Sequence, residues 1–77
     1  MTETPAKPPS VVVKRSVLIA GHRTSISLES AFWQELTKIA KRRGLSINQL
    51  VAEIDAQRTG NLSSALRLYV LKLVKES

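Results

Sequence analysis

The 77-residue sequence contains no cysteine and only one histidine, His22. Without cysteine the chain can form neither a disulfide scaffold nor a thiolate metal site, and one histidine is too few to hold a metal. No apolar run approaches the roughly 18 residues that a membrane-spanning helix needs. We therefore expect no metal, no cofactor and no membrane partner.

Residue patterns typical of catalysis are also missing. Glu53 and Asp55 point in different directions on the helix expected there, so they do not form a carboxylate pair. The sequence has no nucleophile–base arrangement, no phosphate-binding glycine loop and no cofactor fingerprint. Residues 1–10 lack the basic-then-apolar pattern of a signal peptide. We predict a cytoplasmic protein that is not an enzyme.

The chain is strongly basic, with 12 Lys and Arg against 6 Asp and Glu, a net charge of +6. Such a balance favours an anionic partner, nucleic acid before a membrane surface. Pro5, Pro8 and Pro9 disfavour a helix near the N-terminus. We expect a disordered tail over residues 1–14 and one domain over residues 15–77, with Lys14 and Arg15 as candidate phosphate contacts.

Residues 23–28 alternate as a β-strand does. Thr24, Ile26 and Leu28 fall on one side, and Arg23, Ser25 and Ser27 fall on the other. The period then becomes helical and stays so, which predicts a mainly α chain with one short strand. A single strand cannot satisfy its own backbone groups, so we expect a second chain to supply its neighbour.

The preceding residues 11–21 are β-prone but out of phase with that strand. Gly21 is expected to mark a bulge, a bend or a turn between the two segments. Whether residues 11–19 add a second strand stays open. The surface formed by Arg23, Ser25 and Ser27 should in either case not extend back to Val17.

Three helices are expected after the strand. The first covers about residues 30–43 and ends at Gly44, a residue suited to a left-handed C-cap. The second covers about residues 47–57, because Ser46 and Gln49 have the spacing of a capping box.

The third helix is expected over about residues 62–75. It is apolar on two sides, because Leu68, Leu71 and Val74 lie outside its main apolar face. In so short a chain, we expect this second surface to meet a partner subunit.

The order of strand, helix, Gly44-Leu45-Ser46 turn and helix resembles the ribbon-helix-helix (MetJ/Arc-type) DNA-binding superfamily. The fuller string, from Gly21-His22-Arg23-Thr24 to Asn61-Leu62-Ser63-Ser64-Ala65-Leu66-Arg67, is similar to a bacterial subfamily of such domains. The resemblance implies an intertwined homodimer whose strands pair antiparallel and enter the major groove, with the third helix as an extension. The dimer core would then contain Ile26, Leu28, Phe32, Leu36, Leu50 and Ile54.

Strand parity and the resemblance agree on the site. Arg23, Ser25 and Ser27 would contact bases, because arginine can bond guanine bidentately and serine can bond several bases. The start of the second helix, at Ser46, Ile47 and Asn48, would contact phosphate through free amides and the helix dipole.

These features predict a homodimeric, sequence-specific DNA-binding transcriptional regulator, expected to act as a repressor. Its partners would be double-stranded DNA and a second copy of the chain, with higher oligomers on DNA and a protein partner at the third helix as further options. Two alternatives stay open. One is the antitoxin of a toxin–antitoxin pair, and the other is a protein–protein interaction module that docks through the third helix and does not bind DNA.

Overall fold

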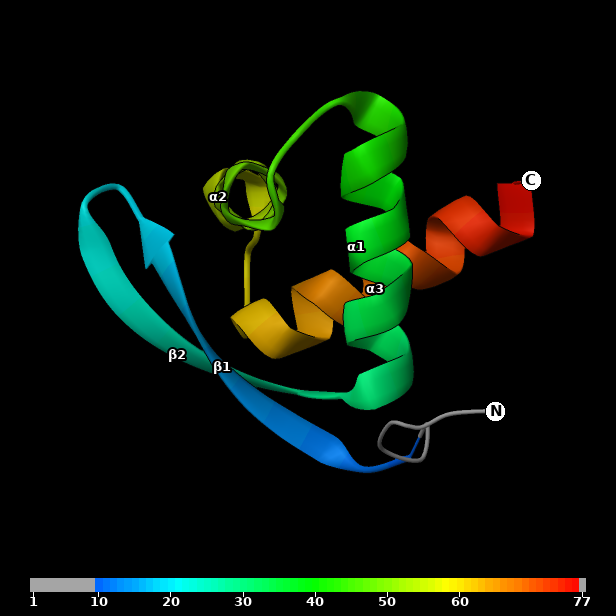
Figure 1. Ribbon diagram of the computed structural model, residues 1–77, viewed down its shortest axis with the longest axis horizontal. Helices are drawn as coiled ribbons and strands as arrows, with labels where there is room; N and C mark the ends of the chain where they lie inside the picture. Colours follow the sequence, from blue (N-terminus) through cyan, green and yellow to red (C-terminus); the bar gives the residue numbers. More distant parts are fainter. Residues whose placement is uncertain (1–9, 77) are drawn as a thin grey trace, which may run out of the picture.

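The computed structural model describes residues 10–76, which form a β-hairpin followed by three helices. In chain order the elements are β1 (Val12–Ile19), β2 (His22–Glu29), α1 (Ser30–Arg43), α2 (Ile47–Gln57) and α3 (Leu62–Glu76). The hairpin curves along one side of the molecule, and the helices pack on its concave face (Figure 1). Within the described residues, no helix combines the length and the apolar character that crossing a membrane requires.

β1 and β2 pair antiparallel in a continuous register that runs from Val12 opposite Glu29 to Ile19 opposite His22. Only Ala20 and Gly21 separate the strands, and both have positive φ, 52° and 82°. Two consecutive left-handed residues are typical of a type I′ turn, whose twist matches that of the flanking strands. Of the bulge, bend and turn considered at Gly21, the structure thus has a turn. The turn explains why the side-chain alternation of residues 11–19 is out of phase with that of residues 23–28.

The expectation of one short strand is therefore wrong, as is the extension of the tail through residue 14, because β1 already begins at Val12. The reason lies at Arg15, which occupies an inward position of β1 opposite Ile26 and interrupts the apolar alternation of that strand. The backbone groups of β2 find their neighbour within the same chain. Residues 1–9 of the predicted tail lie outside the described residues.

The core lies between the concave face of the hairpin and the helices. Val17, Ile26 and Leu28 are buried on that face. The Trp33 indole Nε1 donates a hydrogen bond of 2.8 Å to the Val13 carbonyl and so joins α1 to β1. The buried hydrophobic residues are Val17, Ile26, Leu28, Trp33, Leu36, Ile39, Ala40, Leu50, Val51, Ile54, Leu66 and Val70.

Most residues expected in a dimer core are thus already buried within one chain, and only Phe32 among them is partly exposed. They form an intrachain core, and their participation in a dimer stays a prediction.

The helix ends follow from local sequence. α1 ends at Gly44, which has φ 72°, and the Leu45 amide donates back to the Ala40 carbonyl at 2.8 Å. Ser46 and Gln49 form the expected capping box at the start of α2. The Asn61 side chain accepts a hydrogen bond of 3.1 Å from the Ser64 amide at the start of α3. These caps explain why α1 and α2 span the ranges that the sequence predicts.

α3 crosses behind α1 and contacts both other helices and β2. Leu66 and Val70 are buried, whereas Leu68, Leu71 and Val74 are 65%, 49% and 54% exposed. We call these three exposed side chains the α3 stripe. The second apolar surface expected on this helix is therefore largely exposed among the residues that the structure describes.

Candidate nucleic-acid interface

The convex side of the hairpin, which we call the outer face, carries the side chains expected to contact bases. Arg23, Ser25 and Ser27 are all exposed there. Directly opposite residues of an antiparallel pair share a face, so β1 adds a second row beside them. The paired residues are Leu18 with Arg23, Ser16 with Ser25, and Lys14 with Ser27. The sequence identified the row on β2 and missed the row on β1.

Side-chain size varies along the outer face. Ser16 and Ser25 face each other at its middle, so short hydroxyl side chains occupy the centre. Arg23 lies toward the turn, and Lys14 lies toward the other end. From residue 23 to residue 27 the strand advances by roughly 13 Å, which matches a few stacked base pairs. The stretch between Arg23 and Lys14, with short hydroxyl side chains between two cations, suits a groove lined by hydrogen-bonding edges.

The neighbouring cations Lys14 and Arg15 lie on opposite sides of the hairpin. Lys14 shares the outer face with Ser27, whereas Arg15 shares the concave face with Ile26. The Arg15 guanidinium lies 5.4 Å from the centre of the Trp33 ring, a cation–π distance. The two residues, predicted together as phosphate contacts, therefore lie on opposite faces, and their contact with phosphate stays a prediction. Lys14 fits the outer face, and Arg15 stabilises the packing of α1 on β1.

The start of α2 is attached to the edge of β1. The Asn48 side-chain oxygen accepts a hydrogen bond of 3.3 Å from the Leu18 amide, 30 residues earlier in the chain. A hollow of about 260 Å³ lies at this junction, and it is lined by Ser16, Val17, Leu18, Arg23 and Asn48. The predicted base-contacting and phosphate-contacting segments thus adjoin within one chain.

The capping box decides which groups of α2 remain available. The Ser46 hydroxyl accepts from the Gln49 amide at 3.0 Å, and the Ser46 amide donates to the Gln49 side chain at 2.8 Å. Ser46 is thereby engaged, and the first-turn amides outside the capping box are those of Ile47 and Asn48. With the positive end of the helix dipole they could bind an anion, as the prediction requires.

Positive charge on the hairpin is not neutralised by nearby carboxylates. Among the residues that the structure describes, the ion pairs join Lys38 to Glu35, Arg43 to Glu53, Arg58 to Asp55, and Arg67 to Glu29. None of these pairs involves Lys14, Arg15 or Arg23. The hairpin therefore contributes uncompensated positive charge that would attract an anionic partner.

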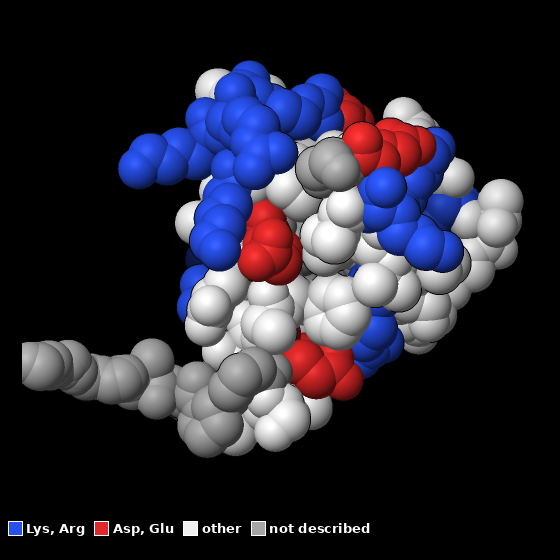
Figure 2. Space-filling view, turned by 90° about the vertical axis from the view of Figure 1, so that its right-hand side faces the viewer, with Lys and Arg blue, Asp and Glu red and all other residues white. Residues whose placement is uncertain are grey.

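Basic side chains also lie far from the hairpin. Figure 2 shows the side of the molecule opposite the hairpin turn, where basic residues gather at the end at which α1 terminates. Lys41, Arg42 and Arg43 occupy the last turn of that helix. Arg43 hydrogen-bonds the Glu53 carboxylate and lowers the pKa of that group. Net charge alone therefore does not locate an interface, and contact of the outer face with bases stays a prediction.

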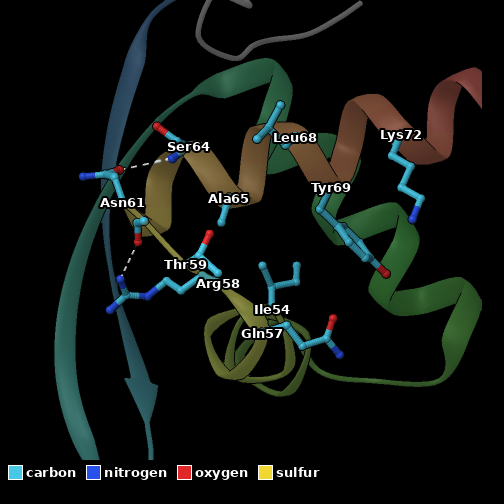
Figure 3. A pocket seen from close by; sticks show the side chains of 11 residues that line it. Ile54, Gln57, Arg58, Thr59, Asn61, Ser64, Ala65, Leu68, Tyr69 and Lys72 are labelled. Carbon is cyan, nitrogen blue, oxygen red and sulfur yellow. Dashed lines mark hydrogen bonds between the residues drawn. The ribbon is translucent and has the colours of Figure 1, made fainter.

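A second hollow, of about 370 Å³, lies between the C-terminal end of α2 and α3 (Figure 3). Ile54, Ala65 and Leu68 supply apolar lining. The Arg58 side chain at its rim is bound to Asp55 and to the Gly60 carbonyl. Within residues 10–76, no three His, Asp or Glu side chains lie close enough together to hold a metal ion.

Comparison with known proteins assigns the arrangement to a family. A family model described as a ribbon-helix-helix domain matches residues 12–74, from the first residue of β1 into the last turns of α3. A similar solved structure is that of an uncharacterized protein from Bordetella pertussis Tohama I, with a TM-score of 0.73 and 31% sequence identity. The match covers 84% of this chain and 57% of that one, so this chain spans little more than half of that relative. No curated protein shows significant similarity to the chain.

Proposed function

Because the chain belongs to the ribbon-helix-helix domain family, we propose that it is a homodimeric, sequence-specific DNA-binding repressor of transcription. Domains of this family bind DNA and dimerise, which fits the net charge of +6. The single observation that carries the proposal is the outer face of the hairpin, where exposed polar and basic side chains stand in register on a two-stranded ribbon. A ribbon of this width fits the major groove of B-DNA.

In this proposal Arg23 provides most of the sequence preference. Its guanidinium can donate two hydrogen bonds to guanine O6 and N7, and a bidentate pair of this kind discriminates against a wrong base by roughly 1–3 kcal/mol. Ser25 and Ser27 contribute less, because a hydroxyl can donate to or accept from several bases. The short side chains let the ribbon lie deep, with room for bridging water.

Phosphate contacts would fix the ribbon in the groove. The amides of Ile47 and Asn48 at the start of α2 lie beside β1, so a phosphate that flanks the groove could bind there while the outer face contacts bases. Lys14 would add a contact at the other end of the ribbon. A protein held in this way would block access to a promoter by occupying it.

Dimerisation would double the number of bases contacted. Because β2 already has β1 as a neighbour within the chain, we propose that a surface other than the ribbon joins two chains. The α3 stripe is exposed, apolar and contiguous along one side of the helix, which supports it as that surface. A two-fold axis there would place two hairpins on an inverted repeat.

Substitution of Arg23 tests the proposal. Binding of the Arg23→Ala variant to DNA from the promoter of its own gene should fall by about 5- to 150-fold, and preference at one base pair should be lost. Arg42→Ala is the matched control, because it removes an exposed arginine outside the ion pairs of the described residues and away from the hairpin. The control should weaken binding to all sequences equally. Unchanged affinity and preference in Arg23→Ala would contradict the assignment of the hairpin.

The α3 stripe also favours a second candidate function, the binding of a different protein, as in an antitoxin that holds a toxin or in a docking module. Salt separates these functions. DNA binding weakens steeply as salt rises because neutralised phosphates release counterions. Apolar docking on α3 would not show that dependence.

A further inference from the structure

We propose that β1 supplies a second, different set of base-contacting side chains, so that a single chain recognises an asymmetric DNA segment. The inference rests on the proposed function and adds Leu18 and Ser16 to its contacts. Leu18 would contact the methyl group of a thymine, and Ser16 would act beside Ser25 at the centre of the ribbon. The recognised thymine should lie within a base step or so of the guanine bound by Arg23, because Leu18 and Arg23 are directly opposite residues.

The exposure of Leu18 has no explanation in the packing of the chain. Val17 and Ile19 point toward the helices, whereas Leu18 is 51% exposed on the outer face opposite Arg23, and the other exposed apolar side chain of that face, Val12, lies at its far end. Each base pair presents a distinct pattern in the major groove, and the C5 methyl of thymine is the feature that an apolar side chain contacts there. A leucine beside an arginine on a ribbon can therefore distinguish thymine while the arginine binds guanine.

A backbone hydrogen bond to α2 holds Leu18 in position. Its amide donates to the Asn48 side chain at the start of α2, so the residue is held relative to the helix end proposed to bind phosphate. Such a connection keeps the base contact and the phosphate contact in a constant relation. A leucine on a strand without this hydrogen bond would not be held at a fixed position relative to the start of α2.

The two rows of the outer face differ at most positions. Leucine stands opposite arginine and lysine opposite serine, and only the central pair consists of two serines. A ribbon made of one strand from each of two identical chains presents the same side chains in both directions and so favours a palindromic centre. The hairpin presents unlike rows, and each half of a dimer site should consequently be asymmetric.

Exchange of thymine for uracil measures the Leu18 contact directly, because uracil lacks only the methyl group. A site is first selected from random duplex DNA with the full chain, and each thymine in it is then replaced in turn. One replacement should lower the affinity of the wild-type protein about fourfold, the value of one buried methyl group. Leu18→Ala should bind thymine and uracil at that position equally.

Leu71→Ala is the matched control, because Leu71 is 49% exposed and lies on α3. Weaker dimerisation in this variant would reduce affinity for both duplexes alike, so its thymine-to-uracil ratio should stay at the wild-type value. Ser16→Ala should relax preference at the position beside that thymine. A palindromic half-site, or a wild-type thymine-to-uracil ratio in Leu18→Ala, would overturn the inference.

The experiment also separates two kinds of failure. If Arg23→Ala loses its base preference while Leu18→Ala keeps its thymine response, only the role of β1 is wrong. If the wild-type chain selects no sequence at all, the proposed function and this inference are both wrong.

Discussion

Ala20 adopts a left-handed backbone conformation, φ 52°, at the first position of the hairpin turn. This conformation costs an L-residue with a Cβ roughly 1–2 kcal/mol, and asparagine tolerates it better than alanine does. Gly21 follows with φ 82° and is suited to its position. The turn therefore carries strain at one residue, although both strands pair through to their last residues before it.

Replacement of Ala20 by asparagine should stabilise the protein. An Asn-Gly pair is the preferred sequence for a type I′ turn, so we expect the free energy of unfolding to rise by up to about 1 kcal/mol in Ala20→Asn. Denaturant unfolding monitored by circular dichroism measures the change. Gly21→Ala, which places a Cβ at a positive φ, should lower stability by a similar amount. A lower free energy of unfolding in Ala20→Asn than in wild type would contradict the assignment of a type I′ turn strained at Ala20.

Single positions differ in how well the sequence predicts them. The exposure of Arg23, Ser25 and Ser27 follows from alternation in β2, where the residue after each of them, Thr24, Ile26 or Leu28, faces inward. The same reasoning is wrong at Arg15. A charged residue at an inward position breaks the apolar alternation, so the pattern predicts that the strand does not extend through it. Its stacking on Trp33 depends on a residue of α1, which no local pattern around Arg15 reveals.

At the scale of elements, α3 is fastened to the hairpin by polar contacts at one end. Arg67 donates to the Glu29 carboxylate at 2.9 Å and 3.4 Å, and the Ser63 hydroxyl donates to the Ser27 carbonyl at 3.2 Å. The hydrogen bond from Arg67 is the main reason why the pKa of Glu29 lies below its ordinary value of 4.5. The contact links the last helix to the strand that carries the proposed base contacts.

This pair makes stability depend on pH. A carboxyl whose pKa is lower in the folded state stabilises the fold above its unfolded pKa, and the contribution is lost as pH falls through the folded pKa. Unfolding of wild type and Glu29→Gln should therefore differ at pH 7, and the difference should shrink as pH falls below 4.5. Glu35→Gln, whose partner Lys38 lies in the same helix, serves as control. A difference for Glu29→Gln that stays constant down to pH 3 would show that its charge plays no part.

Helices and strands were not equally predictable. α1 and α2 carry their own end signals at Gly44 and Ser46, which act within a few residues. β1 has no such signal, because its pairing depends on β2 and on a turn in which alanine stands where asparagine or glycine is usual. Its valines indicated β structure, but only the register of the hairpin shows which side chains share the outer face.

At the scale of the whole molecule, the α3 stripe and the outer face are two surfaces that stay exposed within residues 10–76. The second apolar side of the third helix is evident from the sequence, because it follows from helical spacing alone. The junction between Asn48 and Leu18 is not evident from the sequence, because it brings together residues 30 positions apart. That junction places the proposed base contacts next to the proposed phosphate contacts.

A charge placed in the stripe should separate the proposed dimer. Leu71→Asp would bury an unpaired carboxylate at a two-fold contact, so its mass in sedimentation equilibrium should fall to that of the 8.5 kDa single chain. Ala56→Asp adds the same charge at an exposed position of α2 and should leave the mass unchanged. If the wild-type protein is already a single chain at high concentration, α3 is not the dimer surface.

The turn at Ala20-Gly21 has a consequence for how the ribbon forms. Two strands joined by two residues close in a local folding event, on the order of microseconds for an isolated hairpin, and the encounter needs no second molecule. A ribbon shared by two chains would instead be governed by mass action, and it would dissolve on dilution. Under the proposed function, the number of copies in a cell can set how many DNA sites are filled without changing whether each copy has its hairpin formed.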